Sequence, residues 1–250
     1  MMSEGSSGRE MKFDGSGDMT AEAPSHAGAR MRVVSWNLLR RVGADVEDVA
    51  DLVRRRRPDL LLLQEATEDL TALPSLVGGH FFRHPMQGRI YGLAAWSPHP
   101  LPPTTALRLP ASALPGRVPP RVAQIVRFRG VIFANVHLSH GQFLNRWQLR
   151  HIAGALEGPA AIIGDFNAVG PIMLPEFEDV GPRRRTHKAR NVIALRLDRC
   201  MARELRCLRK EVLEKGPSDH HPIVLDLAVA SEAPGRQSLQ ASLQLRGHNT

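Results

Sequence analysis

The sequence predicts an α/β sandwich with mixed β-sheets, and two observations lead to this expectation. Short apolar segments of strand length alternate along the chain with segments of helical periodicity. Some neighbouring strand segments are separated only by turn residues, whereas helices separate others, which favours sheets with both parallel and antiparallel pairs. The apolar fraction of 42% is enough for a substantial core. One domain over residues 31–230 would accommodate every predicted element.

The first half of this domain begins with an expected strand over residues 31–36, which ends at Asn37. Residues 44–53 repeat apolar side chains at helical spacing, and Pro58 stops the helix after a run of arginines. The apolar run 59–63 is typical of a fully buried strand. A helix over 67–77 and strands over 80–83 and 89–97 complete this half.

The second half opens with residues 98–120, a proline-rich stretch that should be irregular or lie at a sheet edge. Residues 121–127 and 131–136 flank a glycine turn and are expected to form a hairpin. Residues 143–156 predict an amphipathic helix. Its apolar side chains are Phe143, Leu144, Trp147, Ile152 and Leu156. Residues 171–190 are expected to form a loop. The remaining strands are expected over 159–163, 194–201, 205–213 and 223–229, and a short helix is the alternative for 205–213.

The two ends of the chain differ in composition from the domain. Residues 1–30 are rich in Gly and Ser with scattered charges, which predicts a disordered leader and no secretory signal, and residues 231–250 predict a disordered tail. No apolar stretch reaches the ~18 residues of a membrane span, so stable membrane insertion is not expected. Two cysteines, Cys200 and Cys207, suggest no disulfide framework. We therefore expect a cytoplasmic protein, and a monomer.

The formal net charge of +8 favours an anionic partner, which could be nucleic acid, a phosphorylated metabolite or an anionic membrane surface. Arginines cluster at Arg54–Arg57 and Arg183–Arg185. For Arg54–Arg57, the solvated end of a helix, where cations are favourable, is preferred over a nucleic-acid patch. A base bias of the genome would also raise the arginine content, so the charge alone does not choose a partner.

Polar side chains follow apolar strands at six places in the chain. In the segment 162–167 (IIGDFN), Gly164 is expected to end a buried strand, and Asp165 and Asn167 point to one face if the backbone stays extended. Sites in α/β proteins are commonly built at such strand ends. A plain Asx turn is the alternative. The other places carry Asn37, Glu65, His137, Asp198, and Asp219 with His220.

The motifs around these residues resemble those of the endonuclease/exonuclease/phosphatase superfamily, the metal-dependent phosphoesterases related to DNase I and exonuclease III. In order they are WNLL, LLLQEA, FANVHL, IIGDFNA, RLDRCM and GPSDHHPI, and YGLAAWSPHPL resembles a central strand of that superfamily. The resemblance covers nearly all of residues 31–229. It implies a DNase I-like four-layer α/β sandwich, with two mixed β-sheets packed face to face and helices outside.

The resemblance also implies a metal-dependent hydrolase. Glu65 would be the main Mg²⁺ ligand, with Mn²⁺ as a possible substitute, and Asn37 would add a ligand or hold a phosphate oxygen. Asp219 would help to hold the metal or a phosphate-binding network. These oxygen donors suit a hard cation, and no Cys/His spacing fits structural zinc.

The catalytic roles implied by the resemblance fall on five residues. Asp165 would be the general base for the attacking water, and Asn167 would orient the water or the phosphate. Asp198 would pair with His220, whose positive charge could then stabilise the phosphorane. His137 would bind phosphate or act as a general acid.

Structural alternatives remain for several of these side chains. The two asparagines could be turn residues, and His137 could be a buried histidine with satisfied hydrogen bonds. Asp198 could form a salt bridge with the adjacent Arg196 or Arg199. The roles of His140 and His187 stay open, and for His221 a structural role is expected.

Phosphodiester cleavage of the nuclease type, endo or exo, is the expected function, because basicity favours a nucleic-acid backbone. The aromatic content of 5% and the absence of aromatic residues from 98–120 argue against base-stacking platforms. A phosphatase or phosphodiesterase acting on a small molecule or lipid headgroup is the alternative, because one fold serves many substrates. A catalytically inactive phosphate-binding module is a further alternative.

Overall fold

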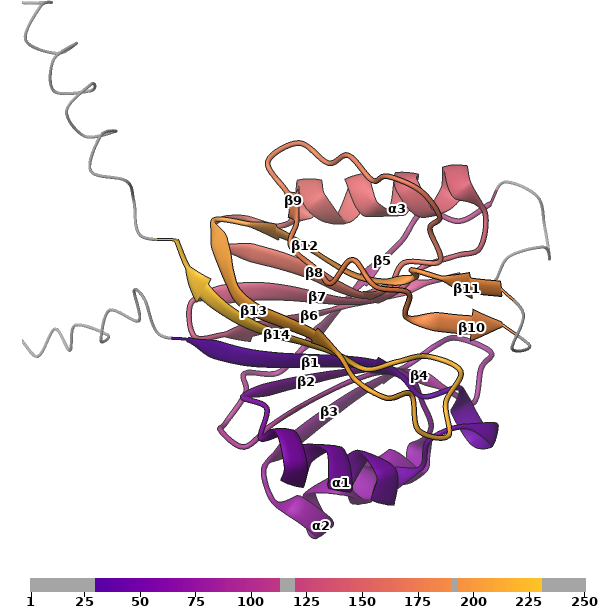
Figure 1. The fold of residues 1–250 in the computed structure, drawn as a ribbon, viewed down its shortest axis with the longest axis vertical. Coiled ribbons are helices and arrows are strands. Elements are labelled where there is room, and N and C mark those ends of the chain that lie inside the picture. Colours follow the sequence, from indigo (N-terminus) through magenta and orange to yellow (C-terminus); the bar gives the residue numbers. More distant parts are fainter. Residues whose placement is uncertain (1–29, 113–119, 190–192, 231–250) are drawn as a thin grey trace, which may run out of the picture.

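The computed structural model describes residues 30–112, 120–189 and 193–230. Two β-sheets stack in the middle of the molecule, α3 (Gln142–Ala155) covers one outer face, and α1 (Val46–Arg56) and α2 (Leu73–Val77) cover the other (Figure 1). This arrangement confirms the predicted four-layer α/β sandwich. The predicted tail and the predicted leader, apart from Arg30, lie outside the described residues.

The first sheet packs against α1 and α2 and has six strands, which run mostly antiparallel. Its only parallel pair within the described residues joins β1 to β2, as the helical crossover through α1 requires. Short 3₁₀ turns at Arg40–Val42 and Glu68–Ala72 follow β1 and β2. In spatial order the strands are β13 (Leu205–Val212), β14 (Ile223–Val229), β1 (Met31–Asn37), β2 (Leu60–Ala66), β4 (Gly92–Ser97) and β3 (His80–Pro85).

The second sheet lies against α3 and also has six strands. β7 and β8 are parallel because α3 connects them, and the other pairs are antiparallel. The strands are, in spatial order, β5 (Thr105–Arg108), β6 (Val122–Phe128), β7 (Val131–His137), β8 (Ala160–Asp165), β12 (Asp198–Arg203) and β9 (Glu178–Asp179). A separate two-stranded ribbon consists of β10 (His187–Ala189) and β11 (Ile193–Leu195) and projects from one end of the sandwich (Figure 1).

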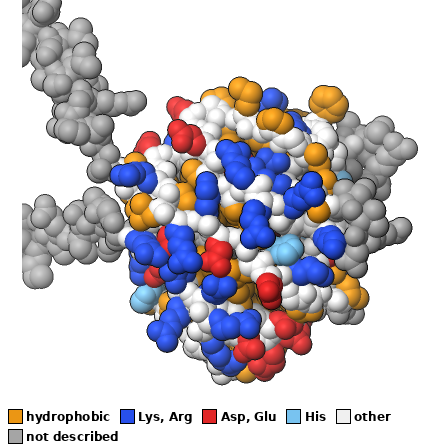
Figure 2. All heavy atoms as spheres, in the orientation of Figure 1, with side chains coloured by type: hydrophobic (Ala, Val, Ile, Leu, Met, Phe, Trp, Pro, Cys, Tyr) orange, Lys and Arg blue, Asp and Glu red, His pale blue; other side chains and the backbone are white. Residues whose placement is uncertain are grey.

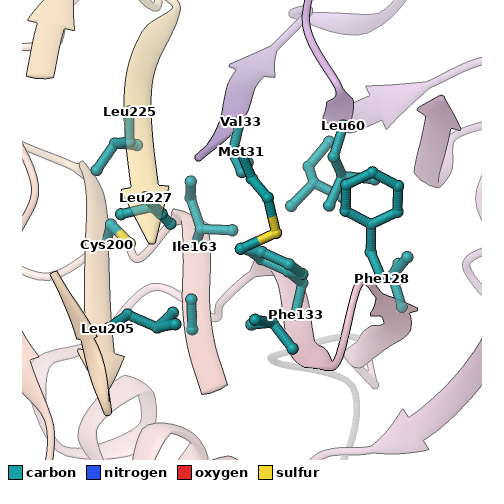
Figure 3. Packing of buried hydrophobic residues seen from close by; sticks show 14 of the residues in the cluster. Met31, Val33, Leu60, Phe128, Phe133, Ile163, Cys200, Leu205, Leu225 and Leu227 are labelled. Atoms are coloured by element: carbon teal, nitrogen blue, oxygen red, sulfur yellow. The ribbon is translucent and has the colours of Figure 1, made fainter. Parts of the chain in front are cut away.

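Three large apolar clusters and one small one hold the four layers together in the described part of the chain. The central one fills the space between the sheets, where Met31, Leu60, Phe133 and Ile163 are almost completely buried (Figure 3). A second cluster joins the first sheet to α1 and α2, and a third joins the second sheet to α3. Burial of these side chains is the main favourable contribution to folding. The strand ends that carry polar residues are thus anchored by packed apolar segments.

A chain of buried polar side chains also crosses between the sheets. Asn135 on β7 donates to the carbonyls of Leu63 and Ala94 in the opposite sheet, and to Gln124 Oε1. It accepts from Gln64 Nε2 at 2.7 Å. Gln64 follows directly on the apolar part of β2 and precedes Glu65, so this network fixes the strand that carries Glu65.

We expect Asn135→Ala to lower the free energy of unfolding by about 2–4 kcal/mol, because it leaves buried donors and acceptors in both sheets without partners. Urea denaturation followed by circular dichroism measures this change. Thr105→Ala, which alters an exposed side chain on the edge strand β5, is the control and should change stability by less than about 0.5 kcal/mol. An equal, small change in both variants would contradict a structural role for the network.

Several predicted segments differ in detail from the structure. The proline-rich stretch contributes an edge strand, β5, as expected, but the expected loop 171–190 contains β9 and β10. The expected strand 194–201 is divided between β11 and β12, because the chain leaves the ribbon before it joins the second sheet. Residues 205–212 form a strand and not a helix. Both cysteines are free, and no described helix has the length and apolar character needed to cross a membrane.

The expected amphipathic helix forms as α3, but two of its assigned apolar residues do not pack. The buried side of α3 consists of Asn145, Gln148, Leu149 and Ile152. Phe143 is 94% exposed and Trp147 is 55% exposed, so the prediction that they contribute to the packed face is wrong. The two rings lie on the opposite side of the helix from its buried residues, since successive helical residues are rotated by about 100°.

Candidate active site

The carboxyl ends of three strands meet at one end of the sandwich. β1 ends in Asn37, β7 in His137 and β8 in Asp165, and the register places His137 beside Asp165. Asp198 at the start of β12 pairs with Asp165 from the other side. A cleft of about 370 Å³ opens there. Seven of the eight predicted site residues line it, namely Asn37, Glu65, His137, Asp165, Asn167, Asp219 and His220.

Asp165 is the residue on which the other side chains converge. Its Oδ2 accepts a hydrogen bond from Asn37 Nδ2 at 3.1 Å and lies 3.6 Å from His137 Nε2 and 3.8 Å from His220 Nε2. Burial alone would raise its pKa, but the neighbouring histidines and the hydrogen bonds from Asn37 and Asn167 outweigh burial and lower it. Asp165 is therefore a buried carboxylate that stays ionised near neutral pH.

The backbone after β8 turns so that Asn167 folds back onto Asp165. The amide N–H of Asn167 donates to Asp165 Oδ1 at 2.9 Å, and its Nδ2 donates to the carbonyl of Leu138. The segment is thus both an Asx turn and part of the site, because the turn orients the carboxylate of Asp165. Asn167 has a φ of +46°, a conformation that asparagine tolerates better than most residues.

Gly164 has a different role from the expected one. β8 continues through it to Asp165, so the glycine does not end the strand. It has a φ of +138°, and a Cβ at this position would lie 2.2 Å from the carbonyl oxygen of Val136 on β7. Only glycine allows β7 and β8 to approach this closely next to the site.

Glu65 reaches the cleft through a β-bulge in β2. The register between β2 and β4 shifts between Gln64 and Ala66, and Glu65 there has a φ of +56°. Bulges of this kind redirect a side chain next to active sites. Burial raises the pKa of the Glu65 carboxyl, and Arg40, whose Nε lies 3.8 Å from Oε2, opposes that effect. Oε2 is buried and has no hydrogen-bond donor.

Asp198 and His220 form the predicted pair. His220 Nδ1 lies 2.9 Å from Asp198 Oδ2, and Thr186 Oγ1 accepts from the backbone N–H of Asp198. Burial alone would lower the pKa of His220, but Asp198 and Asp165 together raise it to about 10. His220 therefore carries a positive charge at neutral pH. The alternative salt bridge of Asp198 is not formed, because the adjacent arginines contact another carboxylate, Asp179.

The pKa of His137 is shifted in the opposite direction from that of His220. Burial lowers its pKa to about 3, although Asp165 opposes this change. Its ring stacks on Tyr91 with the centroids 6.4 Å apart, and its Nδ1 is buried without a partner. A neutral His137 can donate one hydrogen bond to a phosphate oxygen, and this state favours binding of phosphate over acid catalysis.

The structure brings His187, whose role the sequence left open, to the other wall of the cleft. His187 Nε2 lies 3.3 Å from Asp219 Oδ2, and its ring centroid is 4.5 Å from that of His220. The hydrogen bond from His187 lowers the pKa of Asp219. His187, Asp219 and His220 form the compact group of potential metal ligands among the described residues, and Glu65 is not part of it. His140 also lines the cleft.

Arg121 is a residue that sequence reasoning missed. It is 6% exposed, it donates to Met86 Sδ, and its Nε has no partner. Burial lowers its pKa, whereas Tyr91, Asp165 and Glu65 raise it. Its positive charge therefore acts on the carboxylates of the cleft. The sequence placed Arg121 at the start of the expected strand 121–127, and its burial became apparent only in the structure.

The donor set in the cleft fits a divalent cation. Glu65 Oε2, Asp219 Oδ1 and Asp198 Oδ1 are buried oxygens without hydrogen-bond donors. Such oxygens are costly unless a cation or a proton satisfies them. Glu65 and Asn37 supply oxygen donors, which suit Mg²⁺, although His137 Nε2 lies 4.0 Å from Glu65 Oε1. The Asp219 side adds the imidazole of His187.

Several solved structures share the fold of this chain. A structure described as an endonuclease/exonuclease/phosphatase from Beutenbergia cavernae is 19% identical with a TM-score of 0.66, and the match covers 81% of this chain and 72% of that one. A protein of the same description from Bacteroides vulgatus is 17% identical with a TM-score of 0.66, with 80% and 99% of the two chains covered. D. rerio TDP2 in complex with a single-strand DNA product is 14% identical with a TM-score of 0.64, with coverages of 80% and 100%.

No curated protein shows significant sequence similarity to this chain. The sequence pattern of the Endonuclease/Exonuclease/phosphatase family matches residues 34–220, which include every predicted site residue. The chain belongs to the Endonuclease/Exonuclease/phosphatase family. Members of this family are generally phosphoesterases that depend on a divalent metal.

Proposed function

We propose that this protein is a metal-dependent phosphodiesterase of the nuclease type, which cleaves its substrate by in-line attack of a water molecule. The observation that carries the proposal is the convergence on Asp165 of one amide and two imidazoles in differing charge states. Phosphoryl transfer needs mainly positioning and charge neutralisation, and this group offers both.

Each side chain has a role that its surroundings support. Asp165, buried and ionised, accepts a proton from the attacking water, and the Asn167 amide holds the water or a phosphate oxygen. His220 is held positive by Asp198 and stabilises the additional negative charge of the phosphorane. Neutral His137 donates a hydrogen bond to a non-bridging oxygen.

Glu65 and Asn37 would hold Mg²⁺ or Mn²⁺ on one side of the cleft, and Asp219 would act as a ligand or bind the phosphate network. A bound dication would polarise the phosphate and neutralise its charge. Arg121 adds a fixed positive charge near the same carboxylates. The buried carboxylates would then face two positive charges, the bound dication and the guanidinium of Arg121.

Nucleic acid is the substrate class that we favour. Lys and Arg outnumber Asp and Glu in the chain, 33 to 25, and basic side chains are more prominent than acidic ones on the face seen in Figure 2. D. rerio TDP2, which shares the fold, binds a single-strand DNA product. A positive surface around a phosphate-cleaving site would attract a phosphate backbone.

The test compares hydrolysis of an aryl phosphodiester with nicking of supercoiled plasmid, each in Mg²⁺, in Mn²⁺ and in EDTA. We expect both reactions to require metal and to fall by about 10²–10⁴-fold in His220→Ala, because the charge on the phosphorane is no longer stabilised. His80→Ala, which alters an exposed histidine at the start of β3, is the control. Equal turnover of both substrates in EDTA would contradict the proposal.

A phosphoesterase for a small phosphorylated molecule or lipid headgroup is the second candidate. The cleft volume of about 370 Å³ is of the size that small ligands occupy, and this observation favours it. The salt dependence of KM separates the two. KM should rise steeply with salt for a nucleic acid, through counterion release, and only weakly for a small diester.

A further inference from the structure

The described residues expose few large apolar side chains, and four of them lie on α3 and the loop that follows β8. Phe143 is 94% exposed, Trp147 55%, Val169 49% and Met173 88%. Hydrophobic side chains appear at the top of Figure 2, where α3 and this loop lie in Figure 1. Exposed aromatic rings are unfavourable in water, and a group of them next to a site points to a ligand.

This surface continues directly from the candidate active site. Gln142, at the start of α3, and Val169 both line the cleft. Asn145 Nδ2 donates to the carbonyl of Asn167 at 2.8 Å, and the N–H of Val169 donates to Gln142 Oε1 at 3.0 Å. The first turns of α3 are thus bonded to the segment that follows Asp165, and Phe143 directly follows Gln142, which lines the cleft.

The charge of α3 is also suited to an anion. The helix contains Arg146 and Arg150 and no acidic residue. Arg146 donates to the carbonyls of Gln142, Val169 and Pro171, which holds its positive charge in place between α3 and the loop that follows β8. Phe143 and Trp147, one helical turn apart, therefore alternate with cations along one side of α3.

We propose that this side of α3, formed by Phe143, Arg146, Trp147 and Arg150, binds a single-stranded segment of nucleic acid adjacent to the bond in the cleft. Unpaired bases stack on Phe143 and Trp147, and the phosphates lie near the two arginines. The inference rests on the proposed function and extends it to a substrate with unpaired bases. A membrane-binding helix would instead need a wide apolar side, whereas two rings between arginines form a narrow one.

Intrinsic fluorescence gives a direct test in the full-length protein. Trp36 and Trp96 are each 3% exposed, so Trp147 is the tryptophan that a ligand can reach. We expect a short oligothymidylate, added in EDTA to prevent cleavage, to quench Trp147 with saturation, and a matched duplex to bind more weakly. Phe143→Leu should weaken oligothymidylate binding about 5- to 100-fold, whereas Phe143→Tyr should retain it, because stacking needs a ring.

Leu208→Ala, which removes an exposed apolar side chain from β13, is the control and should leave binding unchanged. Equal affinity in Phe143→Leu and wild type would overturn the proposal. Stronger binding to phosphatidylserine vesicles than to the oligonucleotide, lost in Phe143→Leu, would overturn it in favour of a membrane. If the oligonucleotide quenches Trp147 but the wild type hydrolyses no diester, the proposed function is refuted and the binding role of α3 is retained. If the wild type hydrolyses diesters but shows no quenching, only the binding role of α3 is refuted.

Discussion

Asp165→Asn is expected to reduce metal-dependent phosphodiester hydrolysis by about 10³-fold or more, the largest loss from any single isosteric change in the cleft. The amide cannot accept the proton of the attacking water. The substitution also removes the negative charge that faces His137 and His220 at 3.6 and 3.8 Å. Initial rates with an aryl phosphodiester, measured across a range of Mg²⁺ concentrations, give the size of the loss.

Asp226→Asn provides the matched control for this variant. Asp226 is a fully buried carboxylate on β14 that pairs with Arg30 and Arg32, away from the cleft. We expect this change to lower stability and to leave kcat unchanged. Full activity in Asp165→Asn would contradict the role of Asp165 as the general base. If the variant bound phosphate ligands like the wild type and neither protein turned them over, the inactive phosphate-binding module would become the better description.

Asp198→Asn is expected to lower kcat by about 10²–10⁴-fold at neutral pH and to change the shape of the pH profile. In the wild type, Asp198 and Asp165 hold the pKa of His220 at about 10, so its charged form persists through the neutral range. Without the Asp198 charge, the pKa of His220 falls. Activity that needs the charged ring should then decline at a lower pH than in the wild type.

The pairing of Asp198 with His220 also predicts how the stability of the protein depends on pH. The pKa of His220 in the folded protein, about 10, lies above its ordinary value of 6.5. Its contribution to stability is therefore complete below pH 6.5, and it is lost progressively as the pH rises from 6.5 through 10. Thermal unfolding between about pH 6 and 10 should show this decline in wild type and a smaller one in Asp198→Asn.

Asp179→Asn is the control for both experiments, since Asp179 is a largely buried carboxylate that pairs with Arg196 and Arg199 and not with a histidine. It should leave the alkaline limb of the activity profile in place. An alkaline limb that is the same in wild type and Asp198→Asn would show that the charge of His220 is not needed for turnover.

Much of the site was predictable because its residues directly follow apolar strands. Asn37, His137 and Asp165 end β1, β7 and β8, and the parallel pairing of β7 with β8 brings two of them together. The order of most strands and helices was likewise readable from periodicity, but the short strands β9 and β10 and the division between β11 and β12 were not. The contact between Asp198 and His220 was expected from the family resemblance, and the geometry agrees with it.

Other features depend on which surfaces pack, and periodicity does not report this. Phe143 and Trp147 repeat at helical spacing, but the side of α3 with Asn145 and Leu149 meets the sheet, where polar groups at the first turns are needed to bind the loop after β8. The bulge that redirects Glu65 depends on the register between β2 and β4. Neither is encoded in one short stretch of sequence.

The sequence by itself determined the family, the order of the main strands and helices and the residues that stand at the strand ends, because these follow from local patterns and motifs. The tertiary structure alone decided that His187 reaches Asp219, that buried Arg121 acts on the cleft, and that two aromatic rings stay exposed beside it. Each of these three features depends on segments that are far apart in the chain. They arise only when the two sheets and α3 are packed together, since burial and charge depend on neighbours in space.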